Sequence, residues 1–270
     1  MTTRMMKMTA KPTYAPERAY IDRIGNFLSD YSSLAIRSGS TCARLEKNVR
    51  RMAAAWGVEV EMAIMPRHVH ISVTESGGES KTFIAGIGGS VISYDIITRL
   101  SRLSWEVADD GWDVERAAKA LHGIARTPHA GKWWVLLAVS CANGAFCRLF
   151  GGDMTAVGVV FAATMCGYYL KQVMLSRKID VRVVFITCAF VSSVLACADG
   201  LFSLGSTPGI AIATSVLYLV PGIPLLNSFS DMIDRHYICF FSRMTDAGVL
   251  TCCLSIGLCA GMWVMNVGMF

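Results

Sequence analysis

The first half of the chain alternates between two hydrophobic patterns. Apolar side chains recur every three or four positions in four segments, which predicts amphipathic helices. Between them, Val58, Val60, Met62 and Ile64 alternate with polar or small residues, which predicts a strand with one buried face. In chain order, the expected elements are helices at 17–37 and 41–56, strands at 58–65, 68–73 and near 81–85, and helices at 93–108 and 113–125. We therefore expect an α+β domain of order α-α-β-β-β-α-α.

Polar residues mark where two of these helices begin. Ser40 or Thr41 precedes the second helix, and Asp113 precedes the last helix of this half. A hydroxyl or carboxylate at such a position accepts a hydrogen bond from a free backbone N–H of the first turn. These residues are the expected N-caps.

The second half consists of apolar runs separated by short polar connections. Crossing a hydrocarbon core of about 30 Å takes about 20 helical residues, and each run approaches this length. The expected spans are about 133–150, 154–175, 181–200, 208–226 and 247–269. The sequence therefore predicts a multi-pass α-helical membrane protein of about five transmembrane helices with an N-terminal cytoplasmic α+β domain. Its expected parts are a flexible N-terminus (1–16), the α+β domain (17–130) and the transmembrane domain (131–270).

Composition and charge support this division and give an orientation. The chain is 53% hydrophobic, and no glutamate follows Glu115. Residues 1–17 contain no apolar run of signal-peptide length, so we expect no cleaved export signal. Lysine and arginine gather before the first span and in the second and fourth connections, which favours a cytoplasmic location for these segments. The α+β domain is then cytoplasmic and the C-terminus periplasmic, in a bacterial inner membrane.

Several classes of function are disfavoured. The net charge of +5 is spread along the chain without a basic stripe, so nucleic acid is not an expected partner. Most of the 10 cysteines lie singly within apolar runs, as small packing residues do. No P-loop and no G-x-S-x-G elbow occurs, so we expect neither ATP-driven transport nor an enzyme, and no cofactor. His68 and His70 share one strand face, with Glu61 on the neighbouring strand, and form a candidate metal corner. No additional ligand is evident, an exposed polar strand face is the commoner arrangement, and no metal is predicted.

The segment SVLYLVPGIPLLNSFSDMIDRH breaks an apolar helix at Pro221, Gly222 and Pro224. Pro221 lacks an N–H and clashes with the preceding turn, and we expect Pro224 to repeat the disruption one turn later. Backbone groups freed by a break must face protein or a polar cavity, and broken helices often form substrate sites in transporters. A simple kink needed for packing is the alternative. Asn227 and Asp231 share one face of the resumed helix; they suit a substrate or a proton, or an interfacial cap.

Other polar residues fall inside or beside the spans. Asn143 lies near mid-membrane among small residues, where an amide bonds to another helix or lines a cavity. Arg148 suits a carboxylate substrate, or snorkels to headgroups. Asp153 follows Gly151-Gly152 and is a candidate partner of Arg148. Gly257 and Gly261 form a GxxxG pair for close helix packing, within the chain or with a partner.

The arrangement resembles the threonine/serine exporter (ThrE) family over roughly residues 20–265, and most closely its YjjP-like branch. The resemblance rests on SGSTCARLEKNVRRMAAAWGVEVE, GGDMTAVGVVFAA, STPGIAIA and, most specifically, LVPGIPLLNSFSDM. It implies an inner-membrane exporter of small metabolites. In the split form, a YjjP-like chain works with a small YjjB-like membrane subunit, and the pair is associated with succinate export. Fused members carry a second five-span module on the same chain, and we expect this module to be supplied here by a separate subunit.

The leading hypothesis is a subunit of a secondary-active exporter of small carboxylates, most plausibly succinate, with threonine or serine as the alternative substrate. The candidate substrate path contains Asn143, Arg148, Pro221, Gly222, Pro224, Asn227 and Asp231. Asp153 and Asp231 are the candidate proton-coupling residues, because the membrane half contains no glutamate. A membrane-anchored sensor or enzyme and a passive channel are the competing classes. Possible further partners are the lipid bilayer and additional copies of either subunit.

Overall fold

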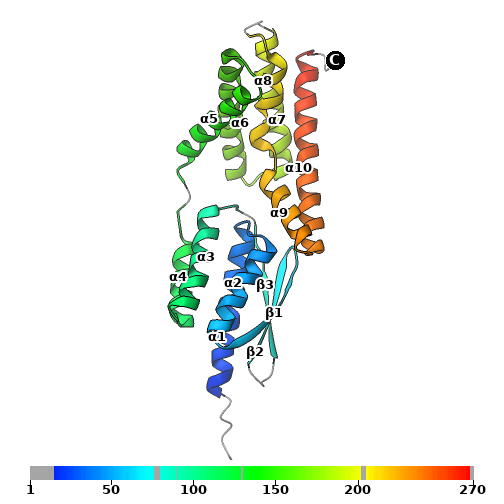
Figure 1. Ribbon diagram of the computed structural model, residues 1–270. Helices are drawn as coiled ribbons and strands as arrows, with labels where there is room; N and C mark the ends of the chain where they lie inside the picture. Colours follow the sequence, from blue (N-terminus) through cyan, green and yellow to red (C-terminus); the bar gives the residue numbers. More distant parts are fainter. Residues whose placement is uncertain (1–14, 76–79, 90, 129, 202–204, 268–270) are drawn as a thin grey trace, which may run out of the picture. The chain divides into compact units, whose positions relative to one another are not determined.

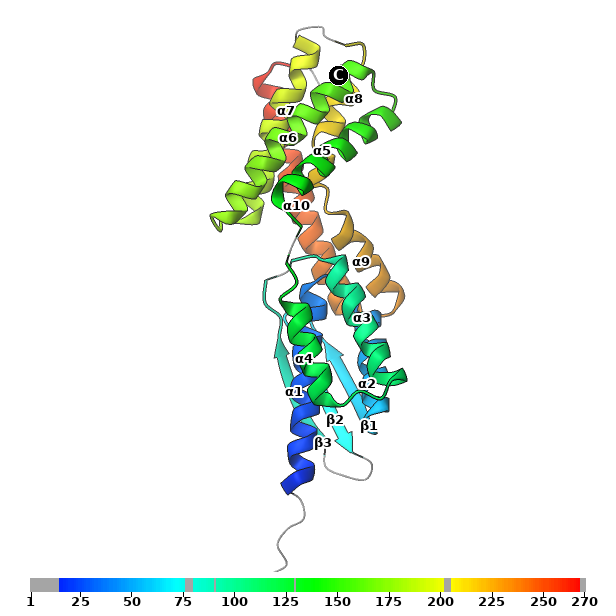
Figure 2. The same cartoon turned by 90° about the vertical axis from the view of Figure 1, so that its left-hand side faces the viewer.

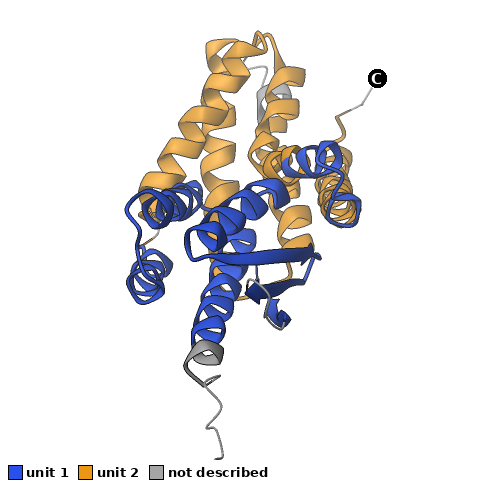
Figure 3. Ribbon diagram, turned by 60° about the horizontal axis from the view of Figure 1, so that its bottom comes forward, with its two compact units in different colours: residues 1–127, 227–240 blue, residues 128–226, 241–270 orange. Residues whose placement is uncertain are grey.

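The computed structural model describes residues 15–75, 80–89, 91–128, 130–201 and 205–267. By internal contacts the chain divides into two compact units, coloured separately in Figure 3. Unit 1 contains residues 1–127 and 227–240, and unit 2 contains residues 128–226 and 241–270. The sequence pattern had assigned all residues after 130 to the transmembrane domain. Residues 227–240 instead pack with the N-terminal elements.

Unit 1 is built from helices on a three-stranded sheet (Figures 1 and 2). Its N-terminal elements are α1 (Ala15–Arg37), α2 (Cys42–Ala55), β1 (Val58–Ile64), β2 (His68–Glu75), β3 (Ser80–Gly86), α3 (Tyr94–Asp109) and α4 (Val114–Ala125). The side chains of Thr41, Ser93 and Asp113 each accept a hydrogen bond from a first-turn N–H of the helix that follows. Thr41 and Asp113 are therefore caps, as the sequence predicted.

The sheet is antiparallel in the order β1-β2-β3. Val60 pairs with Val73 and Ile71 with Phe83, so the apolar members of the alternation share one face. Helices α1 and α2 pack on the sheet, α3 packs on α2, and α4 packs on α3. The core of unit 1 is made of large side chains. The largest that are fully buried include Ile24, Leu28, Tyr31, Leu45, Met52, Leu100 and Leu103.

The described part of unit 2 contains helices joined by short turns, and no strand. Its elements are α5 (Lys132–Leu149), α6 (Met154–Ser176), α7 (Val181–Leu201), α8 (Pro208–Ser215) and the single 3-10 turn η1 (Leu217–Leu219). Two further helices are shared between the units. Helix α9 (Gly222–Ile233) passes into unit 1 at Asn227, and α10 (Tyr237–Val264) belongs to unit 2 from Phe241 onward. Figures 1 and 2 show α5, α6, α7 and α8 grouped together.

Within the described residues, two helices are long and apolar enough to cross a membrane: α6 and α10. A third span is obtained if the bent pair Pro208–Leu219 and Gly222–Ile233 counts as one, and Val181–Cys197 forms a shorter apolar helix. The expected count of five spans therefore stays a prediction. The last helix begins ten residues earlier than the expected span at 247, because Arg243 and Asp246 interrupt the apolar pattern without ending the helix.

Candidate functional site: the broken helix and the residues that follow it

The predicted break is present, and one proline causes it. The axes of Pro208–Leu219 and Gly222–Ile233 differ by 64°. Pro221 is buried between η1 and α9. Pro224 is the third residue of α9, where a backbone N–H has no intrahelical acceptor, so its missing donor costs nothing. The expectation that Pro224 would break the helix a second time was wrong: it helps to start the new helix.

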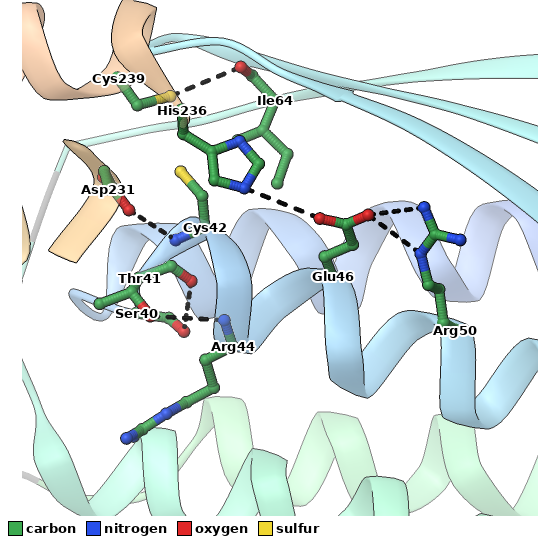
Figure 4. A network of polar contacts seen from close by, with 10 residues as sticks. All are labelled: Ser40, Thr41, Cys42, Arg44, Glu46, Arg50, Ile64, Asp231, His236 and Cys239. Carbon is green, nitrogen blue, oxygen red and sulfur yellow. Dashed lines mark hydrogen bonds and ion pairs between the residues drawn. The ribbon is translucent and has the colours of Figure 1, made fainter. Parts of the chain in front are cut away.

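After the break, α9 turns its polar residues toward the N-terminus of α2. The Asn227 side-chain amide donates to the Gly39 carbonyl over 2.8 Å. Asp231 is completely buried, and its Oδ1 accepts from the backbone N–H of Cys42 over 3.0 Å (Figure 4). Cys42 is the first residue of α2, where free N–H groups and the helix dipole favour a negative charge. The Asp231 carboxylate therefore stabilises both α2 and the docking of α9.

The turn between α9 and α10 extends this contact. His236 Nε2 lies 3.7 Å from Glu46 Oε2, and Arg50 donates to the other Glu46 oxygen (Figure 4). The Cys239 thiol donates to the carbonyl of Ile64 at the end of β1. We call residues 227–240 the docking segment. The sequence analysis did not predict the contact of His236 with Glu46 of α2. Asn227 and Asp231, which lie four residues apart on α9, were the available signal for the packing of α9 against α2.

Asn143 is used within unit 2. It is buried on α5, and its amide donates to Thr164 Oγ1 on α6 over 2.6 Å and to the Thr214 carbonyl on α8 over 3.1 Å. Further buried hydroxyls lie on the neighbouring helices, and Ser192 is hydrogen-bonded to the Tyr218 hydroxyl. Hydrogen-bonded polar side chains therefore lie between the apolar helices of unit 2. We call this group the polar seam; its members are Asn143, Thr164, Ser192, Thr214 and Tyr218. Of the two alternatives from the sequence, the bond to another helix is observed.

Arg148 and Asp153 lie near each other in sequence but bind different groups. The Arg148 guanidinium donates to the Gly152 carbonyl. Asp153 caps α6 by accepting from the Ala156 N–H over 2.7 Å, and it also accepts from the Ser206 backbone and hydroxyl. These hydrogen bonds, that from Ala156 first, lower the pKa of the Asp153 carboxyl. The lowered pKa favours the ionised form, which disfavours Asp153 as a proton carrier near neutral pH.

Gly257 and Gly261 allow α10 to approach α7 within the chain. A Cβ on Gly257 would lie 2.3 Å from the Ile186 carbonyl oxygen, and a Cβ on Gly261 would lie 1.8 Å from Ser193 Oγ. Only glycine permits such close contact between helices. The close packing that the sequence left open therefore occurs between two helices of unit 2.

The weak metal corner does not assemble in the sheet. His70 lies opposite Ala63, while Glu61 lies opposite Ser72. In the described part of the chain, no three His, Cys, Asp or Glu side chains form a group that could hold a metal ion.

Helices long and apolar enough to cross a membrane, a segment bent at a proline and hydrogen bonds between buried polar groups of neighbouring helices are features of a membrane protein. Residues 26–265 match the model of the ThrE family, described as "Putative threonine/serine exporter". The chain belongs to this family.

The chain is similar both to proteins named as succinate transporter subunits and to a protein named as a threonine/serine exporter. Two are named "Probable succinate transporter subunit YjjP". The one from Klebsiella aerogenes is 27% identical over 84% of this chain and 89% of the relative, and the one from Escherichia coli (strain K12) is 24% identical over 83% and 87%. A "Probable threonine/serine exporter" from Mycobacterium tuberculosis is 26% identical over 61% of this chain but 31% of the relative. No solved structure matches the chain.

Proposed function

We propose that this chain is one subunit of a secondary-active exporter of small carboxylates, with succinate as substrate, and that it acts with a second membrane subunit of the YjjB type. The observation that carries the proposal is the alignment with two relatives named succinate transporter subunits over more than four fifths of each chain. The word "subunit" in those names supports a partner. The bent helix and the polar seam of unit 2 supply the structural features that a transport path needs.

The proposed location is the inner membrane, with five spans, unit 1 in the cytoplasm and the C-terminus in the periplasm. The support is the gathering of cations in the connections assigned to the cytoplasm. In this arrangement α5, α7 and the segment 208–226 cross the membrane together with α6 and α10. Lys132 and Arg148 lie near the two ends of α5, and cations at these positions are compatible with lipid headgroups on either side of an α5 span.

We propose that the substrate path contains Asn143, Arg148, Pro221, Gly222, Pro224, Asn227 and Asp231. The guanidinium of Arg148 and the backbone N–H groups at the start of α9 match a carboxylate. Asp231 is the proposed proton-coupling residue, in preference to Asp153. Its carboxylate is buried against the first N–H of α2, so a proton on Asp231 would weaken the docking of α9 and change the end of the bent helix.

Efflux from preloaded membrane vesicles tests this function. Vesicles containing this chain alone, the second subunit alone, or both are loaded with labelled succinate, and a proton gradient is imposed. We expect uphill succinate efflux only with both chains, loss of efflux with an uncoupler, and a large decrease in Asp231→Asn. Asp234→Asn is the matched control, because Asp234 is an exposed acid in the following turn. Efflux that is unchanged in Asp231→Asn, including its pH dependence, would remove Asp231 from the coupling role.

The second candidate is export of threonine or serine, which the family description and the Mycobacterium tuberculosis relative favour. Both amino acids carry the carboxylate that the proposed path accommodates, so the structural argument is the same. The vesicle assay with labelled threonine and serine separates the two. Efflux of an amino acid without efflux of succinate would reassign the substrate. The absence of efflux of all three from vesicles with both chains inserted would contradict the exporter function.

A further inference from the structure

The helical part of the docking segment buries its polar side chains and exposes its apolar ones. Its polar residues Asn227, Ser228 and Asp231 are buried or half-buried against unit 1. Its apolar residues face outward, with Phe229 48% and Ile233 76% exposed. A helix on a soluble domain normally presents the opposite arrangement. The outward face of α9 therefore needs an apolar neighbour.

The same end of unit 1 exposes apolar side chains from other loops. Asn227 binds Gly39, and a Cβ on Gly39 would touch Ile92 at 3.3 Å, so the segment between β3 and α3 lies beside the docking segment. Cys239 binds Ile64, which brings the turn between β1 and β2 to this end as well. We define the apolar end of unit 1 by its exposed residues Met65, Val91, Tyr94, Phe229, Ile233 and Ile238.

Exposed arginines accompany these apolar residues. Arg37 and Arg44 flank the loop between α1 and α2, Arg67 lies in the turn between β1 and β2, and Arg235 lies between α9 and α10. Asp234 is exposed at this end too. Helix α3 begins at this end and runs about 24 Å to the other, where residues 109–115 contain four acids and no base. Apolar residues and arginines therefore gather at one end of unit 1, beside Asp95 and Asp234, and acids gather at the other, where Arg23 pairs with Glu115.

Chain continuity identifies what covers the apolar end. Tyr237 and Ile238 are exposed residues of the first turn of α10, and α10 is long and apolar enough to cross a membrane. The apolar end thus continues directly into a membrane helix. Apolar and aromatic side chains mixed with arginine are typical of protein surfaces at the level of lipid headgroups.

We propose that the apolar end of unit 1 rests on the bilayer surface. Phe229 and Ile233 enter the region between headgroups and acyl chains, while Arg37, Arg44, Arg67 and Arg235 contact lipid phosphates. The second part of α9 is then a helix in the plane of the interface, held to α2 by Asn227 and Asp231. This inference needs only a membrane-embedded α10, and it holds whichever substrate the protein carries.

Photo-crosslinking of the full chain in liposomes tests the proposal. The photoreactive residue p-benzoylphenylalanine replaces Phe229, Ile233 or Tyr94 in phosphatidylethanolamine–phosphatidylglycerol liposomes, and adducts are analysed by mass. Trp263, 83% exposed on α10, is the lipid-facing control, and Glu61 on the outward face of the sheet is the aqueous control. We expect lipid adducts at the three test positions in at least about five times the yield at Glu61. Crosslinks to a second copy of the chain, or lipid yields no higher than at Glu61, would overturn the proposal.

Hydrogen–deuterium exchange of the unsubstituted chain tests the same surface without substitutions. The chain is placed in nanodiscs of either phosphatidylglycerol or phosphatidylcholine. Because four arginines contact phosphates under the proposal, backbone exchange at residues 91–95 and 229–238 should be several-fold slower in the anionic lipid, on the order of three-fold. Residues 106–115 at the acidic end should exchange equally in both. Equal exchange at the apolar end in the two lipids would contradict headgroup contact by the arginines.

Discussion

The two units bury different kinds of side chain. The core of unit 1 is filled by large aliphatic and aromatic residues such as Leu28, Tyr31 and Leu100, contributed by helices and a sheet. The interior of unit 2 contains alanine, cysteine, serine and glycine, with Ala163, Ser192 and Gly257 as examples. Unit 1 is stabilised mainly by removing apolar surface from water. Helices in lipid gain little from that effect, so unit 2 depends on close contact and on hydrogen bonds between helices.

The two units should therefore respond differently when the size of a buried side chain is changed. Removing atoms from unit 1 should leave a cavity, whereas adding atoms to unit 2 should push helices apart. The docking segment lies between these cases, because it is joined to unit 1 by polar contacts while its outward face is apolar. Substitutions in each region therefore test the comparison directly.

The largest effect is expected from Leu28→Ala in α1. Leu28 is fully buried, so its truncation should lower the free energy of unfolding of unit 1 by about 2–5 kcal/mol. Hydrogen–deuterium exchange over α1 and the sheet measures this loss in the full chain. Ile84→Ala is the matched control, because Ile84 is 63% exposed on β3 of the same unit. If the two variants lose equal stability, the burial of Leu28 does not stabilise unit 1 in the way described.

A smaller effect is expected from Gly257→Ala in α10. The added Cβ would lie 2.3 Å from a backbone carbonyl of α7, so the two helices must separate, at a cost of about 1–3 kcal/mol. Thermal unfolding in detergent, followed by a probe in unit 2, measures the change. Gly248→Ala on the same helix adds the same methyl group where nothing lies within 4 Å, so it should be neutral or slightly stabilising. A neutral Gly257→Ala would show that α10 and α7 are not held in close contact.

The docking segment gives the next prediction. Asp231→Ala removes the acceptor of the Cys42 N–H and should destabilise the contact between α9 and α2 by about 1–3 kcal/mol. Asp231→Asn keeps a side-chain oxygen for that bond but removes the charge from the α2 N-terminus, at a cost of about 0.3–1 kcal/mol. Exchange rates of the first turn of α2 report both variants. Equal losses for alanine and asparagine would assign the whole effect to charge rather than to the hydrogen bond.

The strands of unit 1 could be predicted from the amphipathic pattern, because each strand has one face in an apolar core and one face exposed to water. Val58 and Val60 are buried and Glu59 and Glu61 exposed, as their alternation indicated. The break at Pro221 was also predictable, because the missing N–H acts locally.

The docking segment was not predictable in the same way. Its position depends on a tertiary contact between Asp231 and Cys42, which are separated by 189 residues. Hydropathy ended the fourth expected span at residue 226, although α9 continues to Ile233. A polar face that binds protein and an apolar face that is exposed give the same periodicity as an ordinary amphipathic helix. Periodicity alone cannot distinguish the two.

The smallest expected effect concerns Asp153, where charge rather than size is changed. Because hydrogen bonds lower the pKa of Asp153 in the folded protein, the ionised carboxylate contributes stability above its unfolded pKa of about 3.9. That contribution is lost as the pH falls through the lower pKa of the folded state. The difference in melting temperature between the wild type and Asp153→Asn should therefore be largest near neutral pH and should shrink below about pH 4.

Ser206→Ala is a useful companion variant for this prediction. It removes the hydroxyl that donates to Asp153 but keeps the Ser206 backbone donor and the Ala156 cap. It should therefore weaken the pH dependence without abolishing it, since the largest cause of the lowered pKa is the Ala156 bond. A melting-temperature difference between the wild type and Asp153→Asn that grows on acidification would reverse the sign. Asp153 would then be stabilised in its protonated form and would again be a candidate proton-coupling residue beside Asp231.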